Sequence, residues 1–128
     1  MRILICDDDV MLNRLLFSYL RRVYRAEIKI AHDGQAALSH LEHFEPDLIL
    51  LDFMLPKLNG EQLLGEIEQR HRGGRSAFKI VLCTVMDMKK SALARRVDGF
   101  LQKPATVAQI RQAVDAALHL SKAAALSA

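Results

Sequence analysis

Six polar residues stand at the ends of apolar runs, and their types could act together on a charged group. They are Asp7, Asp8, Asp9, Asp52, Thr84 and Lys103. Asp52 is the most unusual, because it ends the apolar run 48–51 and a buried charge is costly unless something pairs with it. Crowded carboxylates raise one another's pKa unless a cation offsets their repulsion. Carboxylates suit Mg²⁺, and an ammonium with a hydroxyl suits phosphoryl oxygens, so the set predicts a site for a phosphoryl group on or beside a carboxylate.

Five short apolar runs predict the strands that would carry these residues: 2–6, 26–30, 47–51, 78–83 and 99–102. The first, third and fourth are continuously apolar, which is typical of strands whose two faces are both covered by helices. Run 26–30 alternates between apolar and polar residues, which predicts an edge strand with one partly exposed face.

Amphipathic segments between the strands predict five helices. Their apolar stripes are Leu12, Leu15, Leu16, Tyr19 and Val23; Ala37, Leu38, Leu41 and Phe44; Leu63, Leu64 and Ile67; and, in the last helix, Ile110, Val114, Ala117 and Leu118. The fourth helix, about residues 88–96, is short and weakly patterned. Thr106 and Gln109 have capping-box spacing at the start of the last helix, and the third helix leads into a Gly73-Gly74 loop.

Alternating strands and helices predict an α/β doubly wound parallel sheet, in which ligands bind outside the carboxyl ends of the strands. Each polar residue has an ordinary explanation when taken singly: Asp8 or Asp9 caps a helix, Thr84 ends a strand, and Lys103 begins an exposed loop. Taken together they share one edge of the sheet, and the joint pattern favours a binding site.

The chain resembles the receiver domain of two-component response regulators over about residues 2–120. The motifs that carry the resemblance are ILICDDD (3–9), PDLILLDFMLPKLNG (46–60), VLCT (81–84) and GFLQKP (99–104), in this order. The resemblance implies a flavodoxin-like doubly wound sandwich with strand order 2-1-3-4-5 and five helices, the fourth of them shortened. We expect residues 1–120 to form the domain and residues 121–128 to form a tail or an extension of the last helix.

The resemblance also implies which residues bind phosphate and metal. Asp52 would be the phosphoacceptor, a carboxylate nucleophile that takes a phosphoryl group from a phosphohistidine or a small phosphodonor. Asp8 would bind Mg²⁺ directly and Asp7 through water, while Asp52 and the backbone carbonyl of Met54 would supply further oxygen ligands. Lys103 would pair with Asp52 and then with the phosphoryl group.

Three further roles follow from the same resemblance. Thr84 would donate its hydroxyl to the phosphoryl group and, with Phe100 as the switch aromatic, would couple phosphorylation to a change of shape. Pro104 would follow a cis peptide bond from Lys103. Gly60 would let the loop after Asp52 close before the third helix.

The sequence departs from the usual family pattern at three places. The interval from Thr84 to Lys103 is roughly three residues short, which we place in the fourth helix. Val85 stands where a smaller residue is common and could narrow access to the phosphoryl group. Met54 and Met86 stand where polar residues are common, and apolar side chains there would position an attacking water poorly, which predicts slow self-dephosphorylation.

Composition is that of an ordinary globular domain, with 51% hydrophobic and 26% charged residues and a formal net charge of +3. The basic residues form small groups, at Arg21, Arg22 and Arg25; at Arg70, Arg72 and Arg75; and at Lys89, Lys90, Arg95 and Arg96. Without interleaved aromatic residues, these basic groups indicate solvent-exposed faces, or a surface that binds an acidic protein, in preference to nucleic-acid binding.

Cys6 and Cys83 lie inside apolar runs and are interpreted as small buried hydrophobes, not as disulfide or zinc residues.

The leading hypothesis is a signalling domain whose only catalysis is its own phosphorylation and dephosphorylation. Its expected partners are a sensor histidine kinase or phosphotransfer protein and an effector protein or fused output domain; a homodimer could form, and no DNA or membrane binding is expected of this domain. A cytoplasmic location follows, because no segment predicts a signal peptide or membrane span.

The alternative functions are a degenerate receiver used only for protein interaction and an unrelated small α/β enzyme such as a phosphatase. No nucleophile–base pair supports the last, and the five histidines are interpreted as surface residues: His32, His40, His43, His71 and His119.

Overall fold

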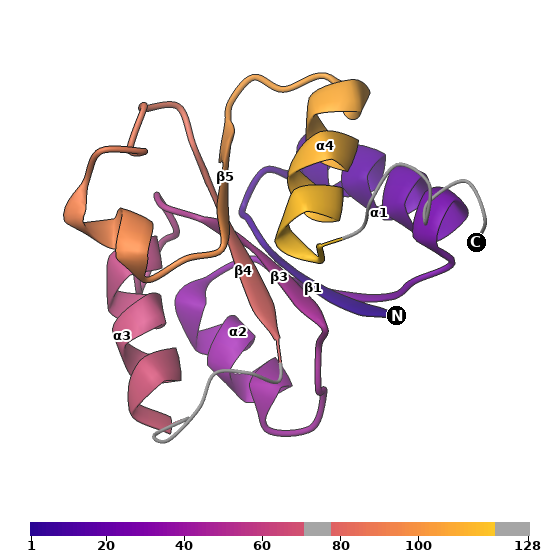
Figure 1. The fold of residues 1–128 in the computed structure, drawn as a ribbon. Coiled ribbons are helices and arrows are strands. Elements are labelled where there is room, and N and C mark those ends of the chain that lie inside the picture. The colour runs from indigo at the N-terminus through magenta and orange to yellow at the C-terminus, as the bar shows by residue number, and fades with distance from the viewer. Residues whose placement is uncertain (71–77, 120–128) are drawn as a thin grey trace.

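The computed structural model describes residues 1–70 and 78–119, and these form a three-layer α/β sandwich (Figure 1). The strands are β1 (Arg2–Cys6), β2 (Glu27–Ala31), β3 (Leu48–Asp52), β4 (Lys79–Thr84) and β5 (Gly99–Gln102). The helices are α1 (Val10–Tyr24), α2 (Gly34–Leu41), α3 (Gly60–Arg70) and α4 (Val107–Ala117), with a 3₁₀ helix η1 (Ala92–Arg95). Four of the predictions concern residues outside the described ranges: the Gly73-Gly74 loop, the basic residues Arg72 and Arg75, the position of His71, and the tail 121–128.

The five strands are all parallel and lie in the order β2-β1-β3-β4-β5, which confirms the predicted fold class and topology. β2 is at one edge and its residues alternate in burial, as its sequence pattern predicts. β3 and β4 each reach one residue further than predicted, so that Asp52 and Thr84 are the last residues of buried strands. This extension places both polar groups at the edge of the sheet.

Two separate apolar clusters hold the helices on the sheet. On one face, α2 and α3 pack on alternate strand residues such as Leu4, Ile49 and Leu82. On the other face, α1 and α4 pack on the intervening residues, such as Ile5 and Leu50 (Figure 1). Because both faces are covered, the central strands are apolar throughout their length, which is why their sequences do not alternate.

Side chains cap the first turns of α1, α2 and α4. The carboxylate of Asp9 accepts from the backbone N–H of Leu12 at 3.1 Å, and that of Asp33 accepts from Ala36 at 2.7 Å. Thr106 and Gln109 form the predicted capping box at the start of α4. These caps satisfy N–H groups that the first turn of a helix leaves without partners.

The predicted fourth α-helix is wrong. Residues 85–98 contain only the 3₁₀ helix η1, so the described residues hold four α-helices instead of five. A short helix forms only when burial supports it, since its first turn is costly to nucleate. Leu93 is the only buried residue of η1, which leaves too little apolar contact for a longer helix.

The loop between β3 and α3 folds tightly back on the end of β3 at Gly60. Its backbone N–H donates to the carbonyl of Phe53 at 2.8 Å. A Cβ atom at this position would lie 2.7 Å from the Cα of Phe53 and 2.9 Å from the carbonyl oxygen of Asp52. Only glycine fits this approach between two stretches of backbone, which confirms the expected role of Gly60.

Gly60→Ala should therefore destabilise the protein by about 2 kcal/mol, because the new methyl group must displace backbone atoms. Gly65→Ala is the matched control: it lies within α3, and a Cβ there would approach only the Arg96 guanidinium, at 4.0 Å. That control should raise stability by about 0.5 to 1 kcal/mol, since alanine is the better helix former. Urea unfolding measures the change in unfolding free energy for each variant. Equal changes for the two substitutions would refute the claim that the close backbone approach at Gly60 requires glycine.

Candidate functional site

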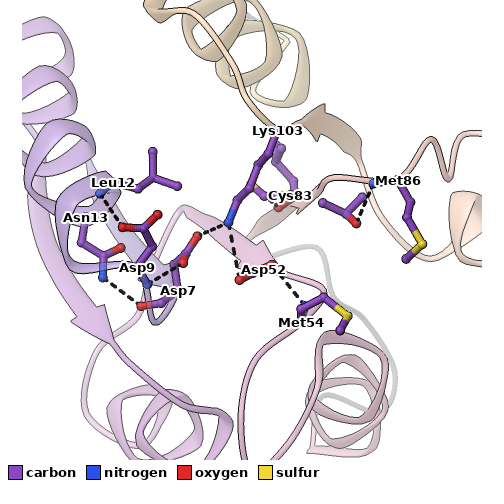
Figure 2. A network of polar contacts seen from close by, with 11 residues as sticks. Asp7, Asp9, Leu12, Asn13, Asp52, Met54, Cys83, Met86 and Lys103 are labelled. Atoms are coloured by element: carbon purple, nitrogen blue, oxygen red, sulfur yellow. Dashed lines mark hydrogen bonds and ion pairs between the residues drawn. The ribbon is translucent and has the colours of Figure 1, made fainter.

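Three carboxylates gather at the carboxyl ends of β1 and β3, and two of them, Asp7 and Asp52, are shown in Figure 2. Cys6 pairs with Leu51 in the sheet, so the residues that follow, Asp7 and Asp52, lie next to each other. Asp7, Asp8 and Asp52 each offer an oxygen within 4.8 Å of the others, and Asp8 is the exposed member. Among the described residues this is the only such group of His, Cys, Asp or Glu side chains that could hold a metal ion. Its hard oxygen donors, one of them open to solvent, fit a Mg²⁺ ion that keeps some of its water.

Lys103 brings a positive charge to these carboxylates from the end of β5 (Figure 2). Its Nζ lies 2.6 Å from Oδ2 of Asp7 and 3.5 Å from Oδ2 of Asp52. The backbone N–H of Lys103 donates to the carbonyl of Thr84 at 2.8 Å, and the following peptide bond to Pro104 is cis, as expected. The structure therefore brings Lys103 to Asp52, with a closer bond to Asp7 that the sequence analysis did not anticipate.

Burial and charge act in opposite directions on these groups. Burial raises the pKa of Asp52, and repulsion from Asp7 adds to this, while the Met54 N–H and the Lys103 ammonium lower it; the net direction is upward. For Lys103, burial lowers the pKa, but the hydrogen bond from its ammonium to Asp7 and the charges of Asp7 and Asp52 outweigh it and raise the pKa. Lys103 is thus held protonated, and Asp52 is a carboxylate short of compensating charge.

Of the other predicted residues, Met54 contacts the cluster directly and Thr84 ends the strand next to Asp52, while Phe100 lies apart from it. The buried hydroxyl oxygen of Thr84 accepts from the N–H of Met86 at 3.2 Å, which leaves its proton to donate elsewhere. The N–H of Met54 donates to Oδ1 of Asp52 at 3.1 Å, while the side chains of Met54, Met86 and Val85 are exposed by 63%, 46% and 64%. Val85 thus extends into solvent and does not fill the site.

Phe100 is half-buried against the α2–α3 face of the sheet and borders a cavity between β5 and α4.

Asn13 is a site residue that the sequence analysis missed. Its Nδ2 donates to the backbone carbonyl of Asp7 at 2.8 Å, and its side chain is buried (Figure 2). The N–H of Asp9 donates to Oδ1 of Asp7 at 2.9 Å, so both contacts orient the same turn. The sequence does contain a hint of this role: Asn13 is a polar residue between Leu12 and Leu16, on the apolar side of a helix that packs on the sheet.

The remaining chemically active residue types lie elsewhere. Cys6 and Cys83 are buried free thiols, and burial raises the pKa of Cys83 to about 12, so their interpretation as small hydrophobes is confirmed. His32, His43 and His119 are exposed and His40 is half-buried, and none belongs to the acidic cluster. No helix within the described ranges has both the length and the hydrophobicity needed to cross a membrane.

Comparison with known proteins finds a matching family and several similar proteins. Residues 3–115 match the family described as the response regulator receiver domain. The alkaline phosphatase synthesis transcriptional regulatory protein PhoP of Bacillus subtilis is 33% identical over 98% of this chain and 52% of its own length. Hybrid signal transduction histidine kinase K of Dictyostelium discoideum is 28% identical over 92% of this chain and 10% of its own length. The chain thus spans about half or less of these relatives.

A solved structure supports the fold. The response regulator protein TrrA from Thermotoga maritima, solved in complex with Mg²⁺-BeF, superimposes with a TM-score of 0.75 at 28% identity. The similarity covers 89% of this chain and 96% of that one.

Asp52→Asn should raise the unfolding free energy of the metal-free protein at neutral pH by about 1 kcal/mol, which is the typical size of the effect of a single substitution. The native pKa of Asp52 is raised by burial, so its ionised form is disfavoured in the folded state. That penalty is absent in acid, where the carboxyl is protonated, and grows as the pH rises through the folded-state pKa. The advantage of the variant should therefore grow over the acid range and level off. Urea unfolding in EDTA at several pH values measures it, and a variant less stable than the native chain at neutral pH would contradict the electrostatic account.

Proposed function

The chain belongs to the response regulator receiver domain family, and from that premise we propose that Asp52 accepts the phosphoryl group, delivered by a sensor histidine kinase or a phosphotransfer protein. The observation that carries the proposal is the position of Asp52: its carboxylate ends a buried strand within the reach of Asp7, Asp8 and Lys103. A structural cap would need neither the other carboxylates nor the ammonium. Like the receiver family in general, the chain has a signalling role, and it acts on no substrate but itself.

The chemistry is nucleophilic catalysis by a carboxylate. An oxygen of Asp52 forms a bond to phosphorus as the bond from phosphorus to the donor's imidazole nitrogen breaks, and that nitrogen leaves with the electron pair. Asp7, Asp8 and Asp52, with the backbone carbonyl of Met54, would hold Mg²⁺, whose charge offsets that of the phosphoryl oxygens. The Mg²⁺-BeF complex of TrrA supports this assignment.

Lys103 and Thr84 would bind the transferred group. The ammonium of Lys103 is shared between two carboxylates, so it stands beside Asp52 before any phosphoryl group arrives. The Thr84 hydroxyl is buried at the end of β4, and its oxygen already accepts a hydrogen bond, which directs its proton toward a new acceptor. Both groups are suited to phosphoryl oxygens, Lys103 as a compact charge and Thr84 as a neutral donor.

Phosphorylation would change the shape of the domain through Thr84 and Phe100. The modification adds about −1.5 to −2 charge next to the Lys103 ammonium, and drawing Thr84 toward it vacates space beside β5. Phe100 is half-buried at that strand, so it can turn inward and shift the population of two conformations. The face formed by η1, β5 and α4 would then report phosphorylation to an effector protein or a fused output domain.

Exposed apolar side chains around the cluster support a protein as the phosphodonor. Val10, Met11, Met54, Val85 and Met86 follow β1, β3 and β4, and all are exposed by 46% or more. Large apolar groups gathered at a polar site are typical of protein interaction surfaces. The alternative, a degenerate receiver that never carries phosphate, leaves the convergence of Asp7, Asp52 and Lys103 without a purpose. A cytoplasmic location and a homodimer remain predictions.

Incubation with a small phosphodonor and Mg²⁺ should add one phosphoryl group to the native chain, as intact mass measures it. Asp52→Asn should add none, because the amide is no nucleophile toward phosphorus, and EDTA should suppress the reaction of the native chain. Asp9→Asn is the matched control: it makes the same chemical change at an exposed helix cap, where asparagine caps equally well. Equal labelling of Asp52→Asn and the native chain would overturn the proposal.

The phosphorylated chain should lose its phosphoryl group slowly, over minutes or longer, because the exposed side chains of Met54 and Met86 cannot orient an attacking water. Met54→Asn should speed the loss by about tenfold, which is ~1.4 kcal/mol in activation free energy. Met11→Asn supplies the control, since Met11 is also exposed but lies on α1. Decay of the phosphorylated mass after removal of the donor gives the rates, and a native lifetime of only seconds would show that the methionines do not slow the reaction.

A further inference from the structure

A cavity of about 370 Å³ lies between α1 and α4, on the sheet face opposite α2 and α3. Its walls are mostly apolar and come from β1, β3, β4, β5 and both helices; they include Ile5, Leu16, Leu50, Leu101 and Ile110. The acidic cluster borders the cavity but does not fill it. None of the roles assigned to Asp52, Thr84 or Phe100 uses this space.

The cavity opens to solvent at one end. Asp9, Val85 and Pro104 are exposed and also line it, so a molecule can enter beside the loop that joins β5 to α4. Ala105 belongs to this loop and borders the cavity with only a methyl group. A larger side chain at residue 105 would occupy space that the native chain leaves open.

The volume and lining of the cavity suit a small organic molecule. An apolar protein cavity of about 150 Å³ is enough to bind benzene, and small-molecule sites begin at about 300 Å³. The space between α1 and α4 is therefore large enough for one aromatic ring or a branched alkyl group together with a short chain. Apolar walls with a few polar groups at one end are the usual composition of such sites.

The charges at the polar end favour a cationic head group. Lys103 already pairs with Asp7 and Asp52, and both oxygens of Asp7 are engaged, one by Lys103 and one by the N–H of Asp9. Oδ1 of Asp9 accepts from Leu12, while its Oδ2 accepts no hydrogen bond from the described residues. An ammonium at the mouth would meet this carboxylate, and an anion would meet an excess of negative charge.

From these observations we propose that the cavity between α1 and α4 binds a small primary amine with an aromatic or branched apolar body. The body lies among the apolar walls, and the ammonium faces Asp9 at the mouth. The side chain of Lys103 borders both this cavity and the acidic cluster, so occupancy would be sensed at Asp52. Binding itself requires neither Mg²⁺ nor phosphorylation, and its failure would leave the phosphoacceptor role untouched.

Titration of the unphosphorylated chain with phenethylamine, followed by amide NMR shifts, tests the proposal. Saturable binding with a Kd of about 1 mM or tighter is expected for a ligand of this size, with shifts in residues of α1 and the start of α4. Ala105→Phe should fill the cavity, weaken binding at least about tenfold and raise the melting temperature. Ala108→Phe is the matched control, because Ala108 is exposed on α4, and it should bind as the native chain does.

The head group is tested separately. The neutral analogue 2-phenylethanol should bind more weakly than phenethylamine to the native chain, and Asp9→Asn should remove most of that difference while keeping the helix cap. Absence of saturable binding, or equal binding by Ala105→Phe and the native chain, would overturn the site. Equal affinity for the amine and the alcohol would overturn the class of ligand.

Discussion

One ammonium shared by two carboxylates is the interaction on which the site depends. Asp7 and Asp52 are both buried at neighbouring strand ends, where burial and repulsion from Asp7 raise the pKa of Asp52. Lys103 offsets part of this, and it can do so only because its strand ends at the same edge of the sheet. A buried charge that loses its partner is strongly destabilising, so the contact ties the last strand of the fold to the first and the third.

The strand order makes this contact possible. In a sheet ordered β2-β1-β3-β4-β5, the ends of β1, β3 and β4 are consecutive, and β5 lies beside β4. A side chain as long as lysine spans from the end of β5 back to Asp7, while the short threonine is supplied by the intermediate strand. The loops then refine the positions: Gly60 closes the turn after Asp52, and Asn13 and Asp9 hold the turn at Asp7.

The segment between β4 and β5 is held in a different way from the rest of the fold. Its 3₁₀ helix buries only Leu93, but Arg96, which follows it, donates to Glu68 of α3 through both Nε and a terminal nitrogen. A two-pronged arginine–carboxylate pair fixes direction well, although such a pair contributes little stability where it is partly exposed. The Arg96–Glu68 pair therefore adds to the apolar packing of Leu93 and Val97 on this face, where the sequence predicted the apolar stripe of a longer helix.

The sequence by itself determined the fold class, the strands, most helix starts and the residues of the acidic cluster. These depend on local signals: apolar runs covered on both faces, caps such as Thr106 with Gln109, and polar residues that end strands. Only the tertiary structure decided that Lys103 lies closer to Asp7 than to Asp52, that Asn13 orients the Asp7 turn and that residues 85–98 form no α-helix. The cavity between α1 and α4 is another feature that only the tertiary structure decided. These features depend on distances between residues far apart in the chain and on how much surface their packed neighbours bury. The spacing of residues within one segment encodes neither quantity.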